Sequence, residues 1–159
     1  MVSRRNNERA FTLVELLCVL TLLGMMMMVA IPAMFDAGEQ RNLEIAARAM
    51  ATDMRLAQQT AITTGAVRCI NIRITVNDYR IGDCVSPNWV RVRMPEGVTI
   101  RSTTFPVTGG FPLLRFNRNG APNIGGTVDL VNTAGEILYV IVTPATGRVR
   151  ISDVPPEHW

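Results

Sequence analysis

The amino-acid sequence predicts an α+β protein in which a long N-terminal α-helix packs on an antiparallel β-sheet domain. Three observations predict this fold: a nearly uncharged apolar run over residues 11–35, a helical stripe of small and apolar side chains over residues 36–64, and alternating polar and apolar residues within 65–159. The length of 159 residues suits a single domain. The sequence shows no internal repeat and no second domain.

The chain opens with a polar leader, residues 1–10, which carries three arginines against one acid. Such an excess of positive charge keeps the end of a membrane protein in the cytoplasm. Positions 16–35 then give 20 uncharged residues, about the length that crosses ~30 Å of hydrocarbon as a helix. The run exceeds the ~7–15-residue apolar core of a secretory signal. Residues 11–35 are therefore predicted to be a retained, single-pass membrane helix.

Glu15 is the one ionisable side chain in this apolar run. A carboxylate there is costly unless it is paired, which favours a functional role. If the chain were cut after Ala10, Phe11 would carry a new α-amino group that could pair with Glu15 of a neighbouring subunit. The alternative is that Glu15 lies near the interface and reaches water. Pro32 indicates a bend or local melting of the helix, or is an ordinary membrane-helix proline.

Residues 36–64 are predicted to continue the helix, because small and apolar side chains recur there every three or four positions. These residues are Leu43, Ala46, Ala47, Met50, Met54, Ala57 and Ala61. The stripe predicts one buried face, which either covers a sheet or serves a coiled coil.

Period-two alternation begins after residue 65 and predicts short strands. A four-residue loop at 75–78 sets Ile74 opposite Tyr79 and Cys69 opposite Cys84, with both cysteines on the polar face. A disulfide between them is then geometrically reasonable and requires an extracytoplasmic location. Two free buried thiols are the alternative. Further strands are predicted at residues 89–94, 98–101, 113–117, 127–131, 137–142 and 148–151.

The composition argues against an enzyme. One histidine and three cysteines are too few for most zinc clusters, and no Ser-His-Asp arrangement is visible. The glycine pairs lack the lysine or the strand-to-helix context of a phosphate-binding loop. We therefore predict no catalytic residue, no metal and no cofactor.

All sixteen basic residues are arginine. Residues 89–118 hold five of them against one acid, namely Arg91, Arg93, Arg101, Arg115 and Arg118. Arg148 and Arg150 follow Gly147 and stand two apart on a predicted strand, hence on one face. Paired guanidinium groups could clamp successive phosphates. The alternative is a solvated strand face.

The string RAFTLVELL, preceded by the basic leader and followed by Pro32, resembles the N-terminal signature of type IV pilins and pseudopilins. In that family a membrane-bound prepilin peptidase cuts before the Phe and methylates the new N-terminus. The resemblance implies cleavage between Ala10 and Phe11, N-methylation of Phe11, and Glu15 as the assembly residue. Ala10 stands where the family usually has Gly, but many members tolerate Ala, so slower processing is the largest effect expected.

The C-terminal strings FNRNGAP and VIVTPATGRVRIS resemble the GspH/FimT branch of minor pseudopilins and minor pilins. Members of the H type cap or initiate the short pseudopilus of type II secretion. Members of the FimT type belong to type IV pili and are linked to DNA uptake through a Gly-Arg-x-Arg motif. That motif corresponds to Gly147, Arg148 and Arg150.

The sequence thus predicts a minor pseudopilin or minor pilin, a structural subunit incorporated near the filament tip. It is expected in the bacterial inner membrane with its β-domain outside the cytoplasm. Implied partners are other pilins through the N-terminal helix, the prepilin peptidase and the inner-membrane assembly platform. The alternative function is a DNA-binding minor pilin that captures extracellular double-stranded DNA for natural transformation.

Overall fold

The computed structural model describes residues 12–85 and 88–156, without the side chains of residues 29–37. The predicted cleavage position between Ala10 and Phe11 therefore lies outside the described residues, as does the side chain of Pro32. The chain divides into two compact units, Met1–Ala37 and Gly38–Trp159.

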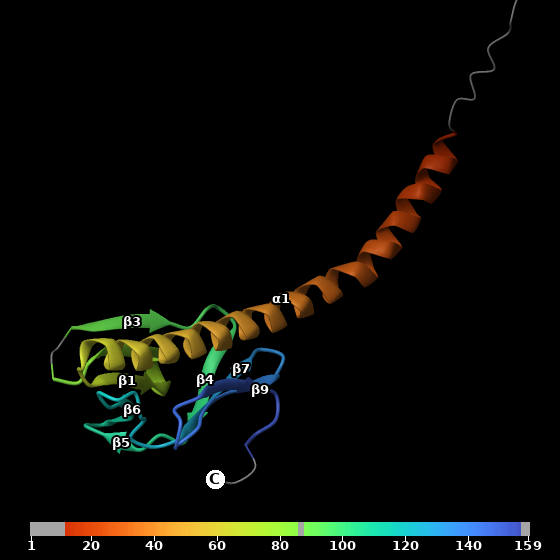
Figure 1. Ribbon diagram of the computed structural model, residues 1–159. Helices are drawn as coiled ribbons and strands as arrows, with labels where there is room; N and C mark the ends of the chain where they lie inside the picture. Colours follow the sequence, from red (N-terminus) through yellow and green to blue (C-terminus); the bar gives the residue numbers. More distant parts are fainter. Residues whose placement is uncertain (1–11, 86–87, 157–159) are drawn as a thin grey trace, which may run out of the picture. The chain divides into compact units, whose positions relative to one another are not determined.

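One helix, α1 (Leu13–Thr64), begins in the first unit and ends in the second (Figure 1). Thr12 caps its start, because the Thr12 Oγ1 accepts a hydrogen bond from the Glu15 backbone N–H at 3.3 Å. Gly65, with a left-handed φ of +61°, follows its last residue. Among the residues that the structure describes, no helical segment combines the length and the apolarity needed to cross a lipid bilayer.

The second unit contains two sheets built from antiparallel pairs. The five-stranded sheet has the order β3-β2-β1-β6-β5, and the four-stranded sheet has the order β4-β7-β8-β9. The strands are β1 (Arg68–Arg73), β2 (Asp78–Asp83), β3 (Trp89–Arg93), β4 (Val98–Thr103), β5 (Val107–Thr108), β6 (Phe111–Phe116), β7 (Gly126–Asn132), β8 (Ile137–Val142) and β9 (Val149–Ser152). The predicted α+β class is confirmed, and the division into two sheets is a feature that the alternation did not predict.

The core of the second unit lies between α1 and the inner faces of both sheets. All seven positions of the predicted helical stripe are buried, so the stripe covers sheets within this chain. Polar bonds add to this packing. The Tyr79 hydroxyl donates to Asp53 Oδ2 at 2.6 Å, and burial together with the Asp53 carboxylate raises the pKa of Tyr79.

The predicted register of the first hairpin is wrong by two residues. The structure pairs Ile72 with Tyr79 and Cys69 with Gly82. The connection has four residues as predicted, but it begins one residue earlier: a 3₁₀ turn, η1 (Ile74–Val76), closes on Asn77, which adopts a left-handed φ of 54°. Strand alternation places Cys69 on the same face of β1 as the polar Asn71 and Arg73, and Cys69 is buried there, with 1% of its surface exposed.

A disulfide joins Cys69 to Cys84 with a Cα–Cα distance of 5.2 Å. Cys84 lies one residue beyond β2, so the link is diagonal to the strand pair instead of directly across it. Gly82, which faces Cys69, adds no side chain there. The disulfide thus ties the end of β2 to the middle sheet strand β1.

Asp78 is a fully buried carboxylate at the start of β2. Arg73 Nε donates to Asp78 Oδ1 at 2.6 Å, and Arg91 Nε donates to Oδ2. Burial raises the pKa of Asp78, but the hydrogen bonds and positive charges of the two arginines outweigh it and hold the pKa below its ordinary value. The ionised Asp78 therefore joins β1, β2 and β3.

Asp78→Asn should lower the free energy of unfolding by about 3 kcal/mol, because it leaves the nearly buried Arg73 without its charged partner. Since folding lowers the pKa of Asp78, the stabilisation is present above the unfolded-state pKa of ~3.9 and is lost as the pH falls through the folded-state pKa. Thermal unfolding of the full chain in detergent at a series of pH values measures both effects.

Glu44→Gln is the matched control, because Glu44 forms an exposed ion pair with Arg48 at 3.4 Å. Its loss should change stability by less than about 0.5 kcal/mol. Equal losses in the two variants would contradict the role assigned to Asp78.

Candidate functional site

The helical surface of the first unit carries large apolar side chains that nothing in its own unit covers. Their exposed fractions run from 46% at Val19 and Leu23 to 81% at Met28. The exposed residues are Leu13, Val14, Leu16, Leu17, Val19, Leu20, Leu22, Leu23, Met25, Met26, Met27 and Met28. Consecutive positions of a helix point in different directions, so this surface surrounds the helix. A helix that is apolar all round is normally covered by lipid or by other protein.

Glu15 lies in the first turn of α1 and is exposed. It stands three residues after the cap Thr12, which is the spacing of a capping box. A carboxylate in this position is also favoured by the positive end of the helix dipole. Sequence reasoning missed Thr12, although the Thr-x-x-Glu spacing is the signal that identifies such a cap.

Gly147 occupies the turn between β8 and β9. Its φ is +65°, and a Cβ placed on it would lie 2.5 Å from Gln58 Nε2 of α1. That same Nε2 donates to the carbonyl oxygens of Gly120 at 2.9 Å and Thr146 at 3.3 Å. Gly147 therefore allows both the turn and the close approach of the helix side chain.

Arg148 and Arg150 are exposed on either side of the buried Val149. The alternation of a strand places both guanidinium groups on the outer face of the four-stranded sheet. The turn at Gly147 thus delivers two neighbouring positive charges to solvent, as the sequence spacing predicts.

The five arginines predicted as a cluster do not all gather. Strand alternation places Arg91, Arg93 and Arg115 on the outer face of the five-stranded sheet. Arg101 belongs to β4 of the other sheet, and Arg118 follows β6 in a turn. Sequence reasoning missed Arg73 and Arg80, which the register places on the same outer face as the first three.

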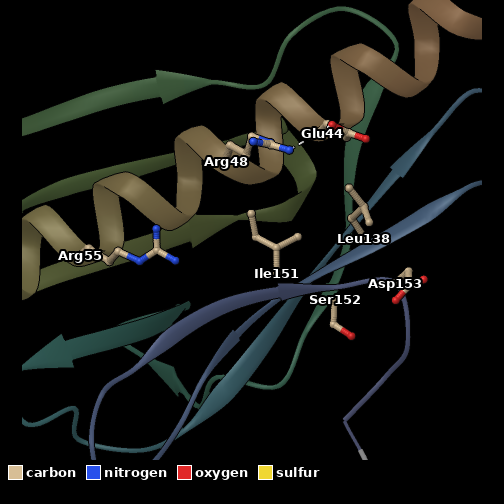
Figure 2. A pocket seen from close by; sticks show the side chains of 7 residues that line it. All are labelled: Glu44, Arg48, Arg55, Leu138, Ile151, Ser152 and Asp153. Carbon is tan, nitrogen blue, oxygen red and sulfur yellow. Dashed lines mark hydrogen bonds and ion pairs between the residues drawn. The ribbon is translucent and has the colours of Figure 1, made fainter.

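A cavity of about 420 Å³ lies between α1 and the strands β8 and β9. Figure 2 shows Leu138 and Ile151 pointing from the sheet towards the helix. Arg48 and Arg55 line the cavity from α1, and Arg55 Nη2 donates to the Val149 carbonyl oxygen at 2.8 Å. Its remaining lining residues are Glu44, Ser152 and Asp153. Across residues 12–85 and 88–156, no three His, Cys, Asp or Glu side chains gather as metal ligands.

Two protein families match the chain. The prokaryotic N-terminal methylation motif matches residues 5–31, and the type II transport protein GspH matches residues 46–147. The chain belongs to the GspH family. The predicted assignment to the pilin-like minor pseudopilins and minor pilins is thereby confirmed.

Individual proteins are also similar to the chain in sequence or in fold. The chain is 29% identical over 147 residues to the competence protein ComGD of Bacillus subtilis (strain 168), covering 92% of this chain and 94% of that protein. Its fold is similar to that of the minor pseudopilin EpsH of Vibrio cholerae, with a TM-score of 0.58, 14% identity, and coverage of 70% of this chain and 96% of EpsH. The type IV minor pilin FimU of Pseudomonas aeruginosa gives a TM-score of 0.55, 15% identity, and coverage of 72% and 90%.

The GspH match ends at Gly147, so Arg148 and Arg150 lie beyond the matched region. We expect Gly147→Ala to destabilise this GspH-family chain more than Gly135→Ala. Gly135 also has a positive φ, of 87°, but a Cβ there meets nothing within 4 Å. Backbone strain alone should cost about 1–2 kcal/mol in either variant. A Cβ at Gly147 would displace Gln58 Nε2 from its two carbonyl acceptors and approach Pro122 Cδ at 3.1 Å, and the lost hydrogen bonds should add about 1 kcal/mol.

Unfolding midpoints of the two variants, measured side by side in detergent, test this difference. Indistinguishable midpoints would show that the helix does not constrain Gly147.

Proposed function

We propose that this chain is a filament subunit whose residues 11–35 hold it in the bacterial inner membrane until assembly. The observation that carries the proposal is the apolar surface surrounding α1 from Leu13 to Met28. In a membrane, lipid would cover this surface, and in a filament the helices of other pilins would replace the lipid. The exchange keeps the surface away from water at every stage.

The leader, residues 1–10, would be removed before assembly. We propose that the prepilin peptidase cuts between Ala10 and Phe11 and that Phe11 is then N-methylated. The match of residues 5–31 to the N-terminal methylation motif supports this. The Cys69–Cys84 disulfide supports a β-domain outside the cytoplasm, since disulfides persist in oxidising compartments. The inner-membrane assembly platform would then place the subunit near the filament tip.

Glu15 is proposed to pair with the α-amine of Phe11 in a neighbouring subunit. The Glu15 backbone N–H is already bonded to Thr12, while its side chain is exposed and available to a partner. Among apolar helices an unpaired carboxylate is costly, so this pair would select one register between subunits. Pro32 is proposed to help the helix bend or locally melt as it enters the filament.

Glu15→Gln should leave cleavage intact but lower incorporation into filaments at least about tenfold, because removing one partner of a buried charge pair costs about 2–5 kcal/mol. Immunoblots of sheared filaments and of membranes measure incorporation and the length of the processed chain. Glu96→Gln, at an exposed position of the second unit, is the control. Normal incorporation of the Glu15 variant would exclude the proposed pairing.

A second candidate function is capture of extracellular double-stranded DNA by Arg148 and Arg150. Two observations favour it: both side chains are exposed on one face beside Gly147, and the chain is similar to a competence protein. Arginine pairs on a strand bind successive phosphates without reading the base sequence. Such binding weakens steeply as the salt concentration rises.

Arg148→Gln/Arg150→Gln should weaken duplex binding by the full chain in detergent. It should also reduce the slope of log K against log salt by about 2, because each phosphate contact contributes about 0.9. Anisotropy of labelled duplex at several salt concentrations measures both quantities. Arg93→Gln/Arg115→Gln removes the same charge from exposed positions of the other sheet. Equal losses in the two double variants would indicate a general charge effect and exclude a site at Arg148 and Arg150.

A further inference from the structure

Strand β9 lies at the edge of the four-stranded sheet, so only one side of its backbone is bonded to a neighbouring strand. Among the described strands it pairs with β8 alone. The Arg148 carbonyl accepts the Thr143 N–H at 3.0 Å, so its backbone faces β8. Because backbone direction alternates along a strand, the N–H and C=O groups of Val149 and Ile151 face away from β8. A side-chain hydrogen bond supports this orientation: Arg55 Nη2 donates to the outward-facing Val149 carbonyl oxygen at 2.8 Å.

Ile151 is the position where this edge is open. Its backbone donor and acceptor point outwards, while its side chain points towards α1 and lines the cavity of Figure 2. A second cavity of about 160 Å³ continues the first and shares Glu44, Leu138 and Asp153 with it. The two together form a groove along α1 that extends from Gln40 to Arg55. This helical stretch is about 22 Å long, which accommodates about six or seven residues of extended chain.

The side chains around the edge of β9 determine which residues an added strand should carry. Inward side chains of an added strand would meet Leu138 and Ile151, which favours apolar residues. Outward side chains would lie on the face that carries Arg148 and Arg150, which favours acidic residues. The edge and the groove therefore fit a chain in which apolar and acidic residues alternate.

We propose that β9 and the adjoining groove bind an extended segment of a partner protein by β-strand addition. Backbone bonds to Ile151 supply affinity, and the alternating pockets and charges supply specificity. This surface belongs wholly to the second unit and does not use residues 11–35. It shares Arg148 and Arg150 with the proposed DNA site, but only an added strand would bond to the Ile151 backbone, so protection of the Ile151 amide distinguishes a bound strand from bound DNA.

The test uses the full chain, labelled with ¹⁵N in detergent, and a seven-residue peptide of alternating Val and Glu. At saturation, hydrogen exchange of the Ile151 amide should slow at least about tenfold. The Arg150 amide already faces β8 and should not change. A peptide of the same composition with its valines in one block is the control. Absence of protection at Ile151, or equal protection by the block peptide, would overturn the proposal.

Ile151→Pro removes the outward N–H at a position where an edge strand tolerates proline, and it also replaces the Ile151 side chain that packs against the core. It should weaken peptide binding at least about tenfold, whereas Ile151→Val should not. N-methylated peptides test the same bond without changing the protein. In antiparallel addition the Val amides face β9, so N-methyl-Val should abolish binding and N-methyl-Glu should spare it. Tolerance of both modified peptides, or protection of Ile151 by dimerisation without peptide, would exclude a partner strand here.

Discussion

Helix α1 carries its apolar side chains in two different arrangements, and the difference determines what can cover each unit. From Leu43 to Ala61 they form one stripe, and the sheets of the same chain bury it. From Leu13 to Met28 they surround the helix and stay exposed. Water is a poor solvent for such a surface, whose burial is favourable by about 25 cal/mol per Å². The second unit can thus complete its fold alone, whereas the first requires lipid or other subunits.

Within the second unit, small residues on α1 allow the helix to pack closely on the sheets. Alanines at positions 46, 47, 51, 57 and 61 bring the helix close to both sheets. Polar side chains from the same helix then reach strand ends: Gln58 bonds to the turns around Gly120 and Thr146, and Arg55 bonds to Val149. The helix thereby fixes the turn that displays Arg148 and leaves the edge at Ile151 open.

The sequence-based predictions succeeded where a pattern is local. The stripe from Leu43 to Ala61 and the placement of Arg148 and Arg150 follow from helical and strand periodicity alone. The first hairpin was misaligned because the buried charge of Asp78, held by Arg73 and Arg91, is a tertiary interaction that favours the register in which Arg73 pairs with Asp78. Alternation also could not show which strands pair across a sheet. The groove at β9 could not be predicted, because it exists only where Ile151 and Leu138 of the folded sheet lie beside α1.

Spin labels on the first unit test the central claim that lipid covers the whole apolar surface before assembly. Leu16→Cys, Leu22→Cys and Met28→Cys, each with Cys18→Ala, place labels about 120° apart around the helix. In vesicles containing the full chain, relaxation by oxygen should be strong and relaxation by an aqueous nickel chelate weak at all three positions. Strong relaxation by the chelate at any of them would show that water reaches the helix and would contradict the account.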